Sequence, residues 1–344
     1  MQKLTAALLA GAVIAPVVAH ADAGNVTIYG RMNVGVEYAD NGDVSKTRVA
    51  NATSRIGFKG NEELGNGLKA IWQVESLVRP DEAQPTDGFA TRNSYVGLAG
   101  SLGSVKLGRI DSPYKDIGGV LNPFGGTTAD FYGAPAPFHR MDVRAKNSVL
   151  VQSATVNGVQ GQAMWATAEN KDSKGLNSQL WGAALTYTQA AVEGGIAYQK
   201  HQDADVAFNV ADGNEAEGVF AYVSAQFGPA RLGVGVDTTT EKTATTSKQR
   251  QTGWAVGGTY QVSDAVQLRA AYVVLGDKGS QADSGARQYA AGVYYAFSKR
   301  TGLLAYSTGI DNDSAANFNF GVNSLGATVG KDPKAHGVLI MHSF

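Results

Sequence analysis

The sequence predicts an all-β protein: a 16-stranded antiparallel transmembrane β-barrel with an inward-folded third loop. Three observations lead to this fold class. After residue 21, no apolar run is long enough to cross a bilayer as a helix. Short stretches that alternate apolar and polar residues continue to Phe344. Mean hydropathy is only -0.16. Alternating strands place one set of side chains in lipid and the other in water, so they span a membrane at low average hydropathy.

Residues 1–21 have the pattern of a secretory signal peptide. Lys3 supplies a basic start, Leu4 to Val18 is almost wholly apolar or small, and Ala19-His20-Ala21 provides the small residues of a cleavage site. The apolar stretch is about 15 residues, short of the roughly 20 that a spanning helix needs. We therefore predict cleavage between Ala21 and Asp22, which leaves residues 22–344 as a single barrel domain.

Composition excludes several classes of protein. Loss of Lys3 with the signal leaves 28 Lys and Arg against 30 Asp and Glu, a balance that gives no indication of nucleic-acid binding. The chain has no cysteine, which excludes a disulfide framework and thiolate metal sites. Its 43 glycines and 14 tyrosines fit a sheet protein with tight turns and a ring of tyrosines at the lipid boundary.

The first three strands show the alternation clearly. The first places Val26, Ile28, Gly30, Met32, Val34 and Val36 on one face, and Thr27, Tyr29, Arg31, Asn33 and Glu37 on the other. The second places Ile56 and Phe58 outward, with Arg55 and Lys59 inward. The third places Leu68, Ala70, Trp72 and Val74 outward, with Lys69, Gln73 and Glu75 inward. The closing strand carries Val338, Ile340, His342 and Phe344 on one face.

Seven tight turns separate alternating segments and set the number of strands. They lie at 63–67, 101–103, 157–158, 189–191, 228–229, 263–264 and 298–300. Seven turns join fourteen strands, and the opening strand at Val26 and the closing strand at Gly337 to Phe344 make sixteen. Both termini then lie on the short-turn side, which is the topology of bacterial outer-membrane barrels.

Longer polar segments between the hairpins are interpreted as extracellular loops. They cover residues 39–50, 76–90, 169–178, 200–217, 238–251 and 276–286. The longest connection, Ile110 to Ala145, is rich in glycine, proline and aromatic residues. A long segment without periodicity is usually functional or disordered, and its aromatics favour packing over solvation. We expect it to pack against the barrel interior.

Several fragments in order resemble the general diffusion porins of Gram-negative outer membranes, in particular the β-proteobacterial and neisserial branch. They are Val26-Thr27-Ile28-Tyr29-Gly30, the run from Ser54 to Gly60 followed by the run from Glu63 to Ala70, Tyr95-Val96-Gly97-Leu98, and Val105-Lys106-Leu107-Gly108-Arg109. The resemblance implies a homotrimer of sixteen-stranded barrels in which the third loop narrows the channel. Enteric members often carry an acid in the segment ending Phe-Gly-Gly. Here the segment is Asn122-Pro123-Phe124-Gly125-Gly126, which argues against a cation-preferring constriction.

A barrel of this size leaves an aqueous lumen whose charged side chains determine selectivity. Parity places Arg31, Arg55 and Lys59 inward, and also Arg140, Arg144 and Lys146 if the strand at Ser148 extends backward. Val96 and Leu98 argue against an inward Arg92, whereas the resemblance favours it. The same parity places Arg109 outward. The candidate acids facing this basic wall at the pore constriction are Asp111, Asp116, Asp130 and Asp142. The excess of bases predicts a mild anion preference.

The function predicted from these features is passive diffusion of small hydrophilic solutes and ions through an outer-membrane channel. A substrate-specific channel is the alternative, and an adhesin or a barrel enzyme fits less well because His139, His201, His336 and His342 stand in no acid-base constellation. No cofactor, metal site or nucleic-acid partner is expected. Outer-membrane lipid and lipopolysaccharide, and the barrel assembly machinery acting on the C-terminal strand with its terminal Phe344, are the expected cellular partners.

Overall fold

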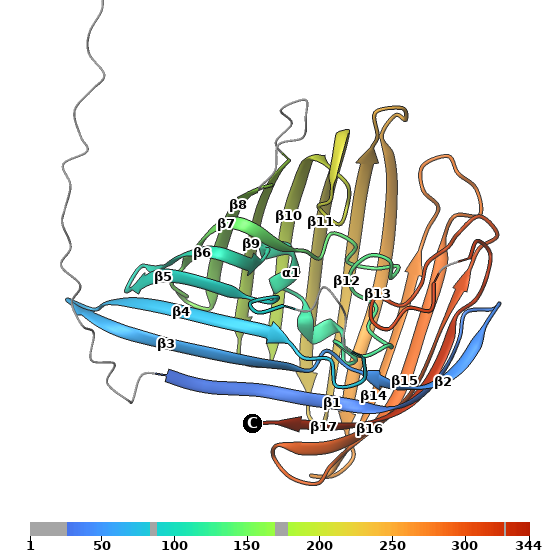
Figure 1. The fold of residues 1–344 in the computed structure, drawn as a ribbon, viewed down its shortest axis with the longest axis horizontal. Coiled ribbons are helices and arrows are strands. Elements are labelled where there is room, and N and C mark those ends of the chain that lie inside the picture. The colour runs from blue at the N-terminus through green and yellow to red at the C-terminus, as the bar shows by residue number, and fades with distance from the viewer. Residues whose placement is uncertain (1–25, 83–87, 169–177, 327) are drawn as a thin grey trace, which may run out of the picture.

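The computed structural model describes residues 26–82, 88–168, 178–326 and 328–344, which form one antiparallel sheet closed into a barrel (Figure 1). From β3 to β17 each strand pairs with the next one in the chain, β1 pairs with both β2 and β3, and β1 also pairs with β17, which closes the barrel. The strands are β1 (Val26–Asp40), β2 (Ser45–Asn51), β3 (Arg55–Gly65), β4 (Leu68–Leu77), β5 (Ser94–Gly100), β6 (Gly103–Asp111), β7 (Arg144–Ser153), β8 (Val159–Thr167), β9 (Gln179–Gln189), β10 (Val192–Ala204), β11 (Val210–Phe227), β12 (Ala230–Lys242), β13 (Gln249–Gln261), β14 (Val266–Leu275), β15 (Ala286–Ala296), β16 (Thr301–Asn312) and β17 (Lys334–Ser343).

The seventeen strand segments make sixteen barrel strands, because β2 and β3 are two parts of one strand. Both pair with β1: β2 along its second half and β3 along its first half. Between them the chain departs from the ladder at residues 52–54, where Thr53 adopts a left-handed φ of 52°. The predicted number of strands and all seven predicted tight turns are confirmed.

The predicted alternation of faces is confirmed along the barrel. Large apolar side chains such as Val36 (58% exposed), Trp254 (58%) and Ile340 (59%) point outward. Polar side chains on the opposite face, such as Glu37 and Asp237, point inward and are buried. With backbone donors and acceptors paired along the closed ladder, these strands can cross hydrocarbon without unpaired peptide groups.

Several of the expected extracellular loops are shorter than predicted. Residues 45–50 of the expected 39–50 loop belong to β2, and the expected 200–217 and 238–251 loops shrink to 205–209 and 243–248. These strands extend beyond the apolar band, where their side chains are polar although the backbone pairing continues. Sequence alternation therefore marks the lipid-facing part of a strand and not its full length.

The segment 112–143, between β6 and β7, contains the two described helices. These are α1 (Pro113–Asp116) and the 3-10 turn η1 (Gly119–Leu121). Ser112 caps α1 by accepting a hydrogen bond from the backbone N–H of Lys115, and Pro113 stands in the first turn, where it has no hydrogen bond to lose. Among the described residues, no helix has the length and apolar character needed to span a membrane.

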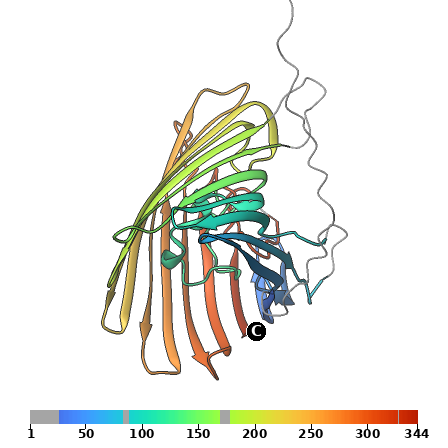
Figure 2. The same ribbon diagram turned by 90° about the vertical axis from the view of Figure 1, so that its left-hand side faces the viewer.

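The two ends of the described chain meet at one rim of the barrel (Figure 2). The N–H of Gly30 donates to the carbonyl of Phe344 at 3.0 Å, and the N–H of Phe344 donates back to Gly30 at 3.1 Å. A Cβ on Gly30 would lie 2.5 Å from Cζ of the Phe344 ring, so only glycine leaves room for that ring. The signal peptide and the cleavage site at Ala21 and Asp22 lie outside the described residues, as do 83–87 and 169–177 of two expected loops.

Candidate functional site

The 112–143 segment packs against the inner face of strands far from its own ends. Its side chains Tyr114, Leu121, Phe124, Phe131, Phe138 and Met141 are fully buried. They join one hydrophobic cluster with Phe220 of β11 and Leu304 of β16. Tyr114 donates a hydrogen bond from its hydroxyl to Asp237 of β12, and the backbone N–H of Arg140 donates to the same carboxylate at 3.3 Å. The segment is therefore held by both apolar and polar contacts.

His139 lies at the centre of an aromatic group that fixes the segment. Its ring stacks on Tyr132 at a centroid distance of 4.5 Å and contacts Tyr114 at 4.6 Å and Phe220 at 4.3 Å. Burial, assisted by the charge of Lys115, lowers the pKa of His139 to about 3. The imidazole is accordingly neutral at pH 7 and packs as an aromatic ring.

Four of the predicted arginines line a single cavity of about 460 Å³ between the sheet and the segment. Arg31 comes from β1, Arg55 from β3, Arg92 from the residues just before β5, and Arg144 from the start of β7. The facing side is formed by the segment itself, including Lys115, Asp130, Tyr132 and Asp142. Thr53, and Gly321 and Val322 of the 313–333 connection, complete the lining.

Buried Glu75 on β4 organises two of these arginines. One carboxylate oxygen of Glu75 is paired with Arg92, and the other lies 3.5 Å from Nε of Arg55 and accepts a 3.0 Å hydrogen bond from Tyr29. Arg144 is held in the same manner, since Asp111 lies 3.0 Å from its Nη2. The acids behind the wall thus orient these guanidinium groups and partly compensate their charge.

Arg31 is held differently from the other arginines of the cavity. Its Nε donates to the carbonyl of Thr53 at 3.2 Å, and its Nη2 donates to the hydroxyl of the same residue. Within the described ranges no carboxylate forms an ion pair with Arg31. The left-handed turn between β2 and β3 therefore positions a cation without neutralising it.

The two acids on the segment side are themselves anchored. Asp130 accepts from the N–H groups of Gly126 at 2.6 Å and Tyr132 at 2.9 Å, and Asp142 is paired with Lys115. Burial raises the pKa of both carboxyls, while these donors and Lys115 act in the opposite direction. Five cations and two acids line the cavity. Counting Glu75 and Asp111 behind the wall leaves a small positive excess.

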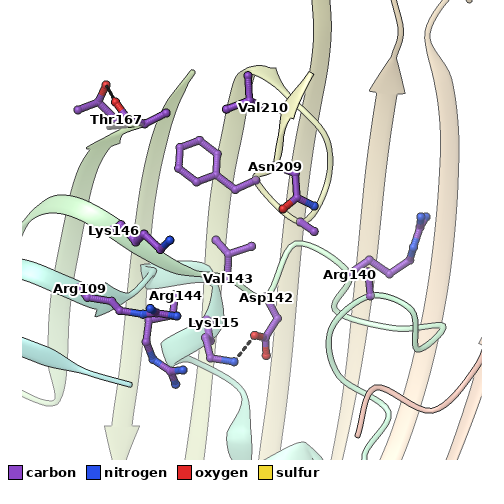
Figure 3. A pocket seen from close by; sticks show the side chains of 14 residues that line it. Arg109, Lys115, Arg140, Asp142, Val143, Arg144, Lys146, Thr167, Asn209 and Val210 are labelled. Carbon is purple, nitrogen blue, oxygen red and sulfur yellow. Dashed lines mark hydrogen bonds and ion pairs between the residues drawn. The ribbon is translucent and has the colours of Figure 1, made fainter. Parts of the chain in front are cut away.

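A second cavity of about 620 Å³ adjoins the first and shares Lys115, Asp142 and Arg144 with it (Figure 3). Arg109 and Lys146 also line this space. The parity argument that placed Arg109 outward is wrong because pairing between β6 and β7 shifts register between Gly108 and Ile110, which breaks the alternation.

Other predicted site residues lie away from the 460 Å³ cavity. The ammonium group of Lys59 sits over the ring of Tyr29, 5.3 Å from its centroid. Arg140 lines the larger cavity and reaches β12 and β13, where it pairs with Glu241 at 3.1 Å and donates to Gln251 at 2.8 Å.

Asp116 accepts a 2.8 Å hydrogen bond from Gln162 and lines a separate cavity of about 390 Å³ that also contains Glu193 and Arg231. Lys146 lines only the larger of the two adjoining cavities, and Asp111 stands behind Arg144. The structure therefore brings Arg31, Arg55, Arg92 and Arg144 together with Asp130 and Asp142, and it distributes the other predicted residues over the barrel interior.

Sequence reasoning missed Lys115 and the inward reach of the 313–333 connection. Lys115 lies in a segment without periodicity, so no parity argument applied to it. The connection contacts the 112–143 segment directly: the amide of Asn323 donates to Thr128 at 3.1 Å, and the N–H of Asn319 donates to the carbonyl of Pro135 at 3.2 Å. The length of this connection between β16 and β17 was the sequence feature that could have indicated its inward position.

Arg92 shows why parity gave an ambiguous answer. Tyr95 is on the inner face of β5, and Val96 and Leu98 are exposed on the outer face, as the sequence suggested. Arg92, however, precedes the first residue of β5, and its N–H donates to the carbonyl of Glu75 at 2.9 Å. The alternation of the strand therefore does not extend to it. In the described part of the chain, no three His, Asp or Glu side chains form a group that could hold a metal ion.

The comparisons with known proteins agree with this architecture. Residues 5–316 match the family model described as Gram-negative porin. The chain is 31% identical over 370 residues to the major outer membrane protein P.IB of Neisseria meningitidis serogroup B (strain H44/76), with both chains covered completely. The chain belongs to the Gram-negative porin family. This porin is a multi-pass outer-membrane β-barrel and forms an outer-membrane diffusion channel.

Solved structures show the same fold at lower sequence identity. The anion-selective porin from Comamonas acidovorans superposes with a TM-score of 0.79 at 23% identity, over 93% of this chain and 99% of that one. OmpF of Salmonella typhi, solved in complex with daunomycin, gives a TM-score of 0.69 at 19% identity, over 93% and 98% of the two chains.

Proposed function

We propose that this porin is a general diffusion channel with a mild anion preference, and that its pore constriction lies between the basic wall (Arg31, Arg55, Arg92 and Arg144) and the 112–143 segment. The observation that carries the proposal is the 460 Å³ cavity, lined by five cations and two acids. Rings of fixed charge at a narrow point are the usual basis of ion selectivity. The Comamonas acidovorans relative is itself named as anion-selective.

The preference is mild because most of the wall is compensated. Glu75 serves both Arg55 and Arg92, and Asp111 serves Arg144. Arg31 is held by neutral oxygens and is the main source of excess positive charge. The reversal potential across a planar bilayer in a KCl gradient tests the proposal, since its sign gives the preferred ion directly. A potential of the sign for cation selectivity would refute the anion preference and leave the channel function intact.

The permeants we propose are small hydrophilic solutes and inorganic ions. A substrate-specific sugar channel would need aromatic rings arranged along the path as a stacking surface. Here Phe124, Phe131 and Phe138 are fully buried within the packed segment and are unavailable to a solute. Concentration-dependent block of the current by a mono- or oligosaccharide would favour the specific-channel alternative. That the chain is not an enzyme stays a prediction.

We further propose that the protein works as a homotrimer in contact with lipopolysaccharide, after removal of residues 1–21 and insertion by the barrel assembly machinery through the strand ending at Phe344. The long apolar outer faces of β1 and β17 are compatible with a subunit contact. Unheated detergent extracts should migrate as a heat-labile trimer, and mass spectrometry should place the new N-terminus at Asp22. A monomer before heating, or an uncleaved chain, would contradict the respective part.

A further inference from the structure

The 112–143 segment rests on a row of inward-facing glycines that we call the glycine trough: Gly218 of β11, Gly235 of β12, Gly253 and Gly257 of β13, and Gly292 of β15. All five lie on the part of the barrel wall that is opposite the basic wall, and they face the segment. An added Cβ at each would approach an atom of the segment within 3.2 Å. The space that side chains would fill at these five positions is thus occupied by the 112–143 segment.

The contacts along the trough are graded. A Cβ at Gly257 would lie 1.8 Å from the backbone carbonyl oxygen of Leu121. At Gly235 it would lie 2.6 Å from Cδ2 of Leu121, and at Gly218 2.6 Å from Sδ of Met141. At Gly253 the nearest segment atom is Cδ2 of Phe138 at 3.2 Å. Only the Gly257 contact involves the main chain, which cannot rotate away as a side chain can.

Neighbouring polar contacts fix the same part of the segment at the same depth. Arg269 of β14 donates from Nη1 to the carbonyl of Pro123 at 2.9 Å and stacks its guanidinium over the ring of Tyr294 at 4.7 Å. The residues around η1 are therefore drawn against β13 and β14 from both sides of Gly257. With the segment packed there, the part of the lumen that stays open lies between the segment and the basic wall.

We infer that the glycine trough, and Gly257 above all, determines the width of the pore by determining how far the segment sits from the basic wall. This inference rests on the proposed constriction. Replacing Gly257 by alanine would force the Leu121 carbonyl from 1.8 Å to an ordinary contact of 3.4–4 Å. Because β13 lies behind the new methyl group, we expect the carbonyl to move away from the strand and into the lumen. Width is thus controlled by residues that carry no charge and that need not touch a permeating ion.

The experiment compares single-channel conductance of the wild-type trimer with that of Gly257→Ala, Gly235→Ala and Gly119→Ala. Gly119 lies in the same segment, and a Cβ there meets nothing within 4 Å, so this variant adds the same methyl group without a clash. We expect conductance to fall by about half in Gly257→Ala, to fall less in Gly235→Ala, and to stay unchanged in Gly119→Ala. Heat-dependent mobility on gels verifies that each barrel has folded.

A rescue variant separates the trough from a general loss of folding. In Gly235→Ala the new methyl meets only the end of the Leu121 side chain and nearby atoms of β11, so the double variant Gly235→Ala/Leu121→Ala should recover conductance. The same truncation should not rescue Gly257→Ala, where the obstacle is a carbonyl. If Gly257→Ala does not fold, the comparison of Gly235→Ala with Gly235→Ala/Leu121→Ala tests the inference alone.

Wild-type conductance in folded Gly257→Ala, an equal loss in Gly119→Ala, or failure of Leu121→Ala to rescue Gly235→Ala would each overturn the inference. Failure of the proposed constriction would give a different result. The wild-type reversal potential would then show no anion preference, and a substitution of Arg31 would not change it.

Discussion

The two sides of the barrel interior use their inward-facing positions in opposite ways. The side formed by β1, β3, β7 and the residues just before β5 carries long cationic side chains, each held by oxygens of the wall. The side formed by β11–β15 has the five glycines of the trough and the ring of Phe220 against the 112–143 segment, and so gives its space to that segment. On the two proposals above, selectivity and pore width are determined by different strands. A substitution on one side should therefore change selectivity, and a substitution on the other should change conductance.

The largest expected effect is reversal of selectivity by Arg31→Glu. Arg31 has no carboxylate partner among the described residues, so its replacement leaves no acid unpaired while changing the lumen by two charges. The reversal potential in a KCl gradient should change sign. The matched control is Lys59→Glu, which makes the same change of charge on the same wall outside the cavity. An equal shift in the control would show that position does not matter.

The next largest effect concerns the side of the barrel on which the segment docks. Phe220 is fully buried among Tyr114, Tyr132, Phe138 and His139. Phe220→Ala should weaken docking of the segment by about 3–5 kcal/mol, the usual cost of a large core truncation. We expect frequent current closures and faster proteolysis within the segment.

Phe227→Ala is the control for this truncation, because Phe227 lies at the end of the same strand and is 63% exposed. It should leave both readouts unchanged. Steady current and wild-type proteolysis in Phe220→Ala would show that the aromatic group does not hold the segment.

A smaller effect is expected from acid. The docked His139 has a pKa of about 3, whereas an undocked histidine has its ordinary value of 6.5. The undocked state therefore binds more protons between these values, and docking loses stability as pH falls from 6.5 toward 3. The raised pKa values of Asp130 and Asp142 act in the opposite direction, because the docked state then holds their protons more tightly.

His139→Gln isolates the histidine contribution to this pH dependence. Amide hydrogen exchange of the segment at pH 7 and pH 4.5 should show acid-induced loosening in the wild type that is reduced in the variant. The same loosening in both proteins would assign the pH dependence to other groups.

The smallest effect is the dependence of selectivity on salt. Debye screening shortens from about 10 Å at 0.1 M to about 3 Å at 1 M, so the field of Arg31 reaches less of the pore at high salt. At a fixed ratio of concentrations, anion preference should decrease as total KCl rises. Gly257→Ala should show the same relative decrease as the wild type, because the wall charges are unchanged. A preference that does not vary with salt would contradict an origin in fixed charge.

Most of the fold could be predicted because barrel strands are specified locally. Lipid on one face and water on the other impose alternation at every strand, as at Val36 and Glu37, and short turns follow from a few residues. The same argument fails where the ladder is irregular. Arg92 precedes its strand, and Arg109 lies at a register shift, so neither obeys the parity of its neighbours.

The candidate site was less predictable for a physical reason. The four wall arginines were found because strand parity or family resemblance applied to them. Which of the predicted cations line the 460 Å³ cavity, and that Lys59 and Arg140 do not, depends on the height of each residue in the barrel and on the position of the segment. Lys115 is placed by the cap at Ser112 and by tertiary contacts that local sequence does not encode. The glycine trough could not be recognised from local sequence, because the segment residues that fill its space lie at least 77 positions earlier in the chain, as Met141 does relative to Gly218.

The paired backbone atoms of Gly30 and Phe344 give the molecule a practical property. Because the first and last strands are hydrogen-bonded neighbours at one rim, a short linker between them would create a continuous ring without altering any register. New ends could then be opened at the Asn66-Gly67 or Gly228-Pro229 turn, giving circular permutants that insert the same channel from a different first strand. Such permutants would show whether membrane insertion depends on the identity of the final hairpin or only on completion of the ring.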